Sequence, residues 1–225
     1  MFNLKEKLNI LIAMPKTIYF NFKVLPLKYA IKFPFIVYNN VKLGELHKVF
    51  TINAPLKTFM ISLGKHSYDG TPEMTKGFFS ASAESHIIFN GIAEFSYGVS
   101  FRAIGKSIIE IGDNFYCNKN CSFIARKHIK IGDDALLGWN VNIMDNDGGN
   151  HKIIEKQIAK TNKEKVIIGN HVWICAFSDI LKGSIINDNC VVAYKSCVIG
   201  EFSGENCIIA GHPARVIKQN IEWIR

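Results

Sequence analysis

The sequence contains no long apolar run, no low-complexity tract and no closely spaced cysteine pair. None of its apolar stretches approaches the roughly 18 residues that a membrane-spanning helix needs. Its six cysteines include no CxxC pair, so we interpret them as small, reduced core residues and expect no metal site. With 48% hydrophobic and 20% charged residues, the chain is neither disordered nor fibrous, and 225 residues suffice for one sizeable core.

No secretory signal is evident near the start of the sequence. The apolar stretch LNILIAM is interrupted by Pro15 and Lys16, and it lacks a cleavage site of small residues. We therefore expect a cytoplasmic protein.

Acidic residues are scarce in residues 1–48, which contain eight lysines but only Glu6 and Glu45. The rest of the chain is nearly neutral and has no helix-turn-helix, zinc-finger or RNA-recognition signature, so we predict no nucleic-acid partner. A basic, apolar N-terminal segment instead indicates peripheral contact with an anionic surface, such as the inner face of a membrane. The alternative interpretation is a solvated amphipathic cap on the core.

A repeat of six residues organises most of the chain. Pairs of apolar or small residues recur without a slip at Val166/Ile168, Val172/Ile174, Ser178/Ile180, Ser184/Ile186, Cys190/Val192 and Ser196/Val198. The same period occurs earlier at Ile109/Ile111, Phe115/Cys117, Cys121/Phe123, Ile129/Ile131, Ala135/Leu137 and Val141/Ile143, with a looser signal at Phe89, Phe95 and Phe101. Gly, Asn and Asp separate the pairs, and these residues accept the backbone angles of tight corners.

These repeats predict an all-β fold, a parallel β-helix whose coils stack as a three-sided prism. Each coil buries its inward residues against the coils above and below it. A β-sandwich would instead show hairpin dipeptides and strands every 8 to 12 residues. We predict the coil over 61–214, with a polar excursion at 145–165, where substrate-handling residues are expected on a rigid scaffold.

The two flanks are predicted to differ from the coil. Region 1–60 is expected to be partly helical, around Leu4–Met14 and Pro26–Ile31, with a strand at the sequence FIVY. Residues 215–225 have apolar residues at helical spacing, so a short C-terminal helix is expected to cap the open end.

Four segments resemble the hexapeptide-repeat acyltransferases, which are left-handed parallel β-helices. They are IGDNFYCNKN at 111–120, IGDDALLGWNVNIMDNDGGNH at 131–151, IGNHVWICAFSDILKGSIINDNCVV at 168–192 and AGHPARVIK at 210–218. The likeness is to the galactoside and maltose O-acetyltransferases and to the enzymes that acetylate capsule and lipopolysaccharide sugars. It implies the left-handed coil, acetyl-CoA as the donor, a sugar-type acceptor, and a homotrimer with active sites between subunits; the period alone does not fix the hand.

The resemblance implies that His151 is the catalytic base. An imidazole can take the proton of an acceptor hydroxyl as it attacks the thioester and return a proton to the thiolate. Asp145 and Asp147 precede it in the same polar segment and are candidates to orient its other nitrogen. We interpret the other six histidines as structural.

For the acceptor, the resemblance implies a role for two residues. Asn118 matches an asparagine that faces the acceptor in the sugar acetyltransferases. Arg126 stands where those enzymes have an acceptor-binding aspartate, so galactosides and maltose are not supported as acceptors.

For the donor, the resemblance implies two groups of residues. Trp173 would wall the cofactor site and the backbone N–H of Ala176 would stabilise the oxyanion. The remaining contacts would come from the main chain at Ala193 and Tyr194 for pantetheine, and from Arg215 and Lys218 for the phosphates. A Thr-Lys pair of the family is replaced here by Ile199-Gly200.

Three other functions were weighed. A γ-class carbonic anhydrase needs three histidines for each zinc, including an HxxxxH spacing that this sequence lacks. A non-catalytic β-helix scaffold has no need of a base in a long loop, which argues against it. An N-acetyltransferase acting on an amino-sugar nucleotide stays open.

Overall fold

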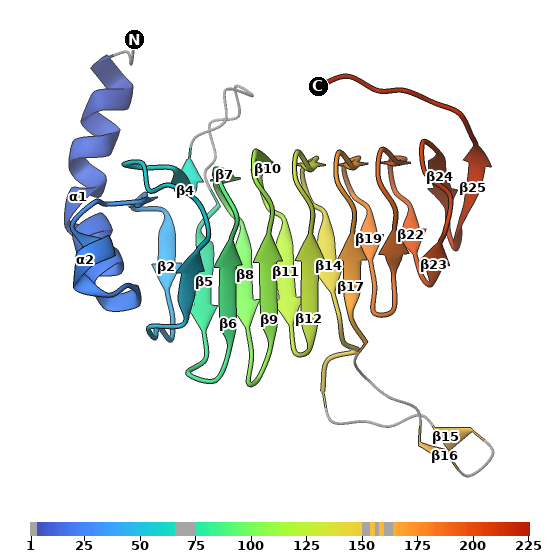
Figure 1. The fold of residues 1–225 in the computed structure, drawn as a ribbon, viewed down its shortest axis with the longest axis horizontal. Helices are drawn as coiled ribbons and strands as arrows, with labels where there is room; N and C mark the ends of the chain where they lie inside the picture. Colours follow the sequence, from blue (N-terminus) through green and yellow to red (C-terminus); the bar gives the residue numbers. More distant parts are fainter. Residues whose placement is uncertain (1–3, 66–74, 150–153, 156–157, 160–163) are drawn as a thin grey trace.

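The structure is a computed structural model that describes residues 4–65, 75–149, 154–155, 158–159 and 164–225 (Figure 1). The described chain winds as a prism with three parallel sheets, which we call sheets 1, 2 and 3 in the order the chain visits them. Each strand pairs in parallel with the strands of the coils before and after it.

Sheet 1 consists of β1 (Phe35–Val37), β4 (Ile61–Lys65), β7 (Ala93–Ser96), β10 (Phe115–Cys117), β13 (Leu136–Leu137), β18 (Trp173–Ile174), β21 (Val191–Val192), β24 (Ile208–Gly211) and the antiparallel β25 (Ala214–Lys218). Sheet 2 consists of β2 (Val41–Leu43), β5 (Gly77–Ala81), β8 (Ser100–Ala103), β11 (Ser122–Ala125), β14 (Asn142–Met144), β19 (Asp179–Ile180) and β22 (Cys197–Val198). Sheet 3 consists of β3 (Phe50–Ile52), β6 (His86–Phe89), β9 (Ile108–Ile111), β12 (His128–Ile131), β17 (Val166–Ile168), β20 (Ile185–Ile186) and β23 (Glu201–Phe202). A short hairpin, β15 (Ile154–Glu155) with β16 (Ile158–Ala159), lies in the excursion outside the prism (Figure 1).

The core lies inside the prism, and every inward pair predicted from the six-residue period is buried. The first coils are filled by phenylalanines in edge and stacked contacts, such as Phe79 on Phe101 with ring centroids 4.6 Å apart. The later coils are filled by aliphatic residues and by serines. The hydroxyl of buried Ser184 donates to the carbonyl of Val198 at 3.0 Å, so its burial leaves no unpaired donor.

The corners are formed by residues in the left-handed backbone region. Asn114, Asp134, His171, Asn189 and Asn206 form one such row, where the chain passes from sheet 3 to sheet 1, with φ between 50° and 60°. Asn and Asp tolerate this conformation better than most residues. Because Asn and Asp recur between the apolar pairs, the sequence predicted the positions of these corners correctly.

Helix α1 (Leu4–Val24) covers the N-terminal end of the prism and continues through Pro15. Its buried residues include Phe20, which packs edge-on against Phe35 at 5.1 Å. Two polar residues of the same face pair with the free backbone of the edge strand β1: the Asn21 amide donates to the Phe35 carbonyl, and the Thr17 hydroxyl accepts from the Val37 N–H. The helix therefore closes a sheet edge that would otherwise be open to other chains. The short helix α2 (Leu27–Ala30) follows.

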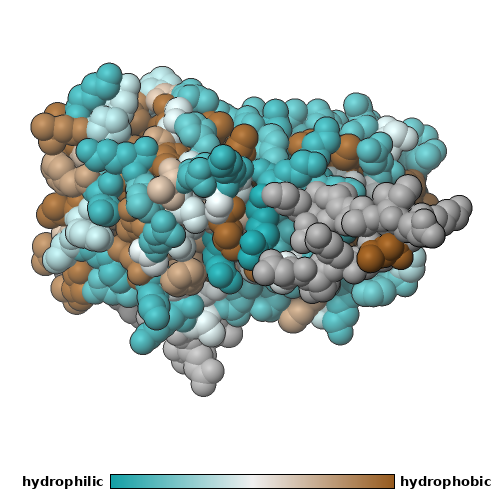
Figure 2. Space-filling view, turned by 90° about the horizontal axis from the view of Figure 1, so that it is seen from below, coloured by the Kyte–Doolittle hydropathy of each residue, from teal (hydrophilic) through white to brown (hydrophobic). Residues whose placement is uncertain are grey.

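The opposite face of α1 lies on the surface. Figure 2 shows apolar side chains gathered at this end of the molecule, whereas the prism is mostly hydrophilic in that view. Within the described residues, no helix combines the length and apolar content that crossing a bilayer requires.

Two predictions about the flanks are corrected. The first coil begins at β1, near Phe35 rather than at residue 61, because the predicted FIVY strand pairs with β4. Residues 215–225 form no helix: Ala214–Lys218 is a strand on the open edge of β24, and the rest is extended. The free backbone groups of β24 offered hydrogen bonds that outweighed the helical spacing of the apolar residues.

Candidate active site

Asp145 anchors the start of the excursion. Its side chain is fully buried, and its two oxygens accept the backbone N–H groups of Arg126 at 2.8 Å and Lys127 at 2.7 Å. Its own carbonyl accepts the N–H of Glu164 at 2.8 Å, so the two ends of the excursion are held together. A buried carboxylate with charge-assisted bonds of this kind fixes the backbone at the start of the excursion.

Asp147, the second predicted partner of the base, forms an ion pair with Lys182 at 2.7 Å. His151 itself lies outside the described residues, so its predicted contact with either aspartate stays a prediction. In the chain it follows the described Gly149 by two residues.

A pocket of about 290 Å³ lies at this edge of sheet 2. Its floor is apolar, and the guanidinium-bearing residues Arg102 and Arg126 lie on neighbouring coils at its rim, together with the loop residues from Asn146 to Gly149. Arg102 was not singled out from the sequence. It occupies an outward position of β8 beside Ile124, and its place in the same pocket as Arg126 depends on the stacking of two coils rather than on any motif.

A second group of predicted residues lies at the corner between sheets 1 and 2. Asn118 and Ala193 follow β10 and β21 at equivalent positions, and each donates its N–H to the next coil. The N–H groups of Cys175 and Phe177 donate to backbone carbonyl groups. The N–H of Ala176, which lies between them, has no acceptor among the residues that the structure describes. That amide is thus an unused donor, as an oxyanion site requires.

The backbone of Ala193 is already engaged. Its N–H donates to Ile209, and its carbonyl accepts the hydroxyls of Ser178 at 3.0 Å and Ser196 at 2.7 Å. A hydrogen bond from pantetheine to Ala193 would therefore have to replace one of these.

An aromatic pair at this corner was missed by sequence reasoning. Phe177 and Tyr194, both exposed, meet edge-on with centroids 5.6 Å apart, and the Lys195 ammonium lies 5.5 Å from the Tyr194 ring centroid. Phe177 and Lys195 have φ of 60° and 57°, at corner positions where Asn120 and Asn140 stand in earlier coils. A bulky residue in that region is unusual, and this signal in the sequence could have identified the pair.

The strand at the C-terminus keeps the two predicted phosphate-binding cations on one face. Arg215 pairs with Ala210 and Lys218 with Ile208, and an irregularity between Ile208 and Ile209 compensates for the odd spacing. Since positions 208 and 210 project to the same side of β24, Arg215 and Lys218 do so as well.

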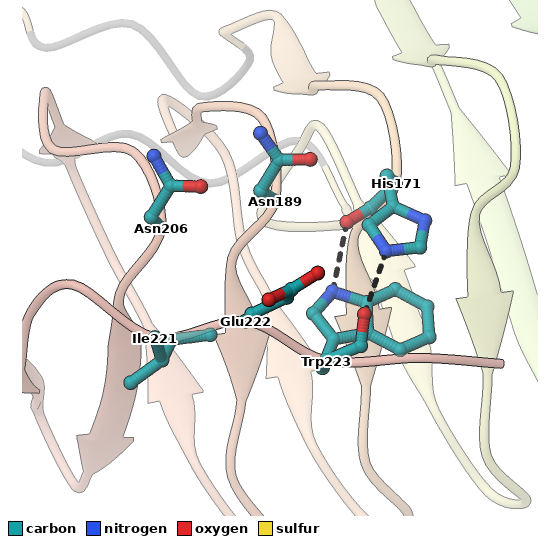
Figure 3. Close-up of a pocket in the computed structure, with 6 residues that line it drawn as sticks. All are labelled: His171, Asn189, Asn206, Ile221, Glu222 and Trp223. Atoms are coloured by element: carbon teal, nitrogen blue, oxygen red, sulfur yellow. Dashed lines mark hydrogen bonds between the residues drawn. The ribbon is translucent and has the colours of Figure 1, made fainter.

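Trp173 is 38% exposed and lies beside the C-terminal tail. Its ring centroid is 5.9 Å from that of Trp223, which in turn stacks on His171. His171 and Trp223, with Asn189 and Asn206 from the same row of corners, border a pocket of about 420 Å³ (Figure 3). The contact with Trp223 was not predicted, because it joins residues 50 positions apart through a tail expected to be helical.

Four of the predicted site residues therefore lie at the two edges of sheet 2. Asn118, Ala176 and Tyr194 lie at the corner with sheet 1, whereas Arg126 and the start of the excursion lie at the corner with sheet 3. The four residues of β11, about 13 Å of extended chain, span the distance between these two corners. A single chain therefore keeps Arg126 and the start of the excursion apart from Ala176 and Tyr194, whereas Asn118, the other predicted acceptor residue, lies on the donor side.

Comparisons with known proteins agree with this architecture, although no family model matches the chain. WbbJ of Escherichia coli K12, named as a lipopolysaccharide biosynthesis O-acetyl transferase, is 32% identical over 135 residues, which cover 56% of this chain and 68% of WbbJ. The galactoside O-acetyltransferase of the same organism is 34% identical over 125 residues, which cover 56% of this chain and 57% of that enzyme. The crystal structure of NeuO, a polySia-specific acetyltransferase, superposes with a TM-score of 0.60 and 20% identity over 85% of this chain and 78% of NeuO, which shows a shared fold.

The chain belongs to the hexapeptide-repeat acetyltransferases. This membership confirms two predictions, the left-handed parallel β-helix and an enzyme of the acyltransferase class.

Proposed function

We propose that this protein transfers an acetyl group from acetyl-CoA to a hydroxyl group of a sugar in a surface polysaccharide, with His151 as general base. The acceptor oxygen attacks the thioester carbonyl and His151 takes its proton. The carbon–sulfur bond then breaks, and the thiolate leaves as coenzyme A after receiving a proton. Family membership and the names of the relatives support the reaction and the acceptor class.

For the donor, the corner between sheets 1 and 2 supplies suitable groups. The unused N–H of Ala176 fits the developing oxyanion. Phe177 and Tyr194 offer flat apolar surface for the organic part of the cofactor, and Arg215 with Lys218 offers paired cations for its phosphates.

The proposed acceptor site is the pocket beside the excursion. Arg102 and Arg126 border it, and Asp147, the acidic residue of its rim, is paired with Lys182. A guanidinium pair matches a carboxylate or phosphate in geometry and charge. We infer that the acceptor sugar carries such an anionic group, which agrees with Arg126 replacing an aspartate of the neutral-sugar enzymes.

The assembly is proposed to be a homotrimer. In one chain the proposed donor groups and the arginine-lined acceptor pocket lie at opposite edges of sheet 2, so a neighbouring subunit that presents its other edge would bring them together. His151 of one chain would then face Trp173 of its neighbour.

A cytoplasmic location is supported by the cysteines. Five of the six are buried as core residues, and all six are free thiols. Burial and the neighbouring Cys207 thiol raise the pKa of Cys190 to about 12, so the Cys190 thiol has little tendency to ionise and react.

The decisive experiment is thiol release from acetyl-CoA with matched acceptors: neutral sugars, uronic or sialic acid sugars, and nucleotide sugars. His151→Ala should lower kcat by about 10²- to 10⁴-fold, as loss of a general base does. Arg126→Gln and Arg102→Gln should raise KM for anionic acceptors while leaving the KM for acetyl-CoA unchanged. Full activity of His151→Ala, or equal use of neutral acceptors, would contradict the corresponding part of the proposal.

A second function, N-acetylation of an amino-sugar nucleotide, is kept because the same arginines suit a nucleotide phosphate. Mild alkali distinguishes the two products, since it cleaves an acetyl ester and leaves an acetamide intact. An alkali-stable product would replace the O-acetyl proposal.

A further inference from the structure

The outward face of α1 is apolar along its length. Its exposed large side chains are Leu8, Leu11, Ile12, Ile18, Tyr19 and Phe22, with Leu11 67% and Tyr19 55% exposed. At 3.6 residues per turn these positions fall within an arc of about 120°, which makes one continuous stripe. We call these six residues the α1 stripe.

The helix is therefore apolar on both sides. Its inner side, with Phe20 and Val24, is fully buried on the prism. A helix on a protein surface normally carries polar residues on its outer side, so a second apolar side indicates another apolar environment. Helix α2 lies at the same end of the molecule (Figure 1), and Leu27, Tyr29 and Ile31, in and after it, add further exposed apolar side chains there.

Lysines border this surface. Around the axis of α1, Lys7 lies on one side of the α1 stripe and Lys23 on the other. Lys28 and Lys32 lie next to the exposed apolar residues of α2, and all four lysines are exposed. Lys16 is not part of this border, because its ammonium donates to the carbonyls of Asn39 and Val41 at 2.8 Å.

Negative charge is almost missing from these helices. Glu6 is their single acidic residue, and it is half-buried in a pocket that Lys65 also lines. The surface thus presents apolar side chains and positive charge together.

We propose that the α1 stripe docks on the surface of an anionic lipid bilayer, with α1 lying in the plane of the membrane. The apolar side chains would enter the headgroup boundary while the lysine stems extend to the lipid phosphates. Tyr19 and Tyr29 have the amphipathic rings that favour this depth. A second copy of the chain fits less well, since pairing two such surfaces would bring like-charged lysine borders together. This inference is independent of the proposed reaction.

The test uses the full chain, because removing residues 1–48 would also remove β1, β2 and the cap on the core. Co-sedimentation is measured with vesicles of phosphatidylcholine alone and of phosphatidylcholine mixed with phosphatidylglycerol. We expect binding to the mixed vesicles and, for Leu11→Asn/Ile18→Asn, a fall in the partition coefficient of tenfold or more, given about 25 cal/mol for each Å² of apolar surface. The matched control is Ile224→Asn, an exposed apolar residue at the other end of the chain, which should bind as the unaltered protein does.

Charge is tested separately. Lys7→Gln/Lys23→Gln should reduce binding to the mixed vesicles by roughly thirtyfold, at about 1 kcal/mol for each lysine, and Lys106→Gln should not. Equal binding of the Leu11→Asn/Ile18→Asn variant, or equal binding to neutral vesicles, would overturn the proposal. A lower molecular mass of that variant in lipid-free light scattering would overturn it in favour of a contact between copies of the chain.

Discussion

The indole ring of Trp223 stacks on the imidazole of His171, with centroids 4.0 Å apart and planes inclined by 9°. Two hydrogen bonds of 3.0 Å run in both directions between them: the indole N–H donates to the His171 carbonyl, and the His171 ring bonds the Trp223 carbonyl (Figure 3). Further along, Arg225 donates to the Asn114 carbonyl and the Asp134 carboxylate. The tail therefore runs back over one row of corners and ties several coils together (Figure 1).

Loss of the tail's contacts should lower the stability of the protein. Trp223→Ala removes the stacked ring and one hydrogen bond, so we expect the free energy of unfolding to fall by about 1–2 kcal/mol. Urea denaturation measures it, and limited proteolysis should then cut within residues 219–225. Trp223→Phe keeps the ring contact and should lie between the two. An unchanged midpoint for Trp223→Ala would show that the tail does not stabilise the coil.

The docking of the tail should depend on pH. Burial by itself would lower the pKa of His171, but the bonds to the Trp223 carbonyl and the Asp134 carboxylate outweigh it and raise the pKa above the usual value. A raised pKa in the folded state means that the contribution is fully present below about pH 6.5 and is lost as pH rises through the folded-state pKa. We expect the protection factors of the amides in residues 221–225, which correct for the intrinsic base catalysis of exchange, to fall across that range. In His171→Asn this fall should vanish, and protection factors that do not change with pH in the unaltered protein would contradict the expectation.

The two aspartates of the excursion should respond differently to the same change. Asp145→Asn weakens two charge-assisted bonds to buried backbone amides, so we expect a loss of about 2–3 kcal/mol in stability. Asp147→Asn breaks a partly exposed ion pair with Lys182 and should cost less than about 1 kcal/mol. Thermal unfolding of both variants tests the contrast. Equal losses of stability would contradict the expectation that the buried Asp145 stabilises the fold more than the partly exposed Asp147.

The aromatic pair should contribute to donor binding. Tyr194→Ala and Phe177→Ala each remove exposed ring surface at the proposed cofactor corner, so we expect KM for acetyl-CoA to rise by about tenfold with a smaller effect on kcat. Ile92→Ala is the control, since it is an exposed apolar residue near the N-terminal end. A change confined to the KM for the acceptor would show that the pair contacts the acceptor and not acetyl-CoA.

Assembly should be necessary for activity. Light scattering is expected to give three times the mass of the chain, and activity per chain should fall on dilution below the dissociation constant. Mixing inactive His151→Ala chains with inactive Trp173→Ala chains should restore part of the activity, because some shared sites then have both residues. A fully active monomer would exclude a site formed between subunits.

The six-residue period by itself determined the prism. Pairs such as Val166 and Ile168 were predicted to point inward because a strand alternates its faces, and all of them do. The same reasoning was weaker at the ends. Val216 and Ile217 suit a helix or a strand, and only the free edge of β24 decided for the strand.

The sequence also determined the family through four local segments, and with it the class of reaction. Tertiary structure alone decided which residues come together: Arg102 and Arg126 line one pocket from neighbouring coils, Phe177 meets Tyr194 at a corner, and Trp223 meets His171 through an extended tail. It likewise decided that the outer face of α1 stays uncovered. The physical reason is that a repeat specifies which face of each strand is buried, whereas contacts between coils depend on how successive turns are aligned, which no local period encodes.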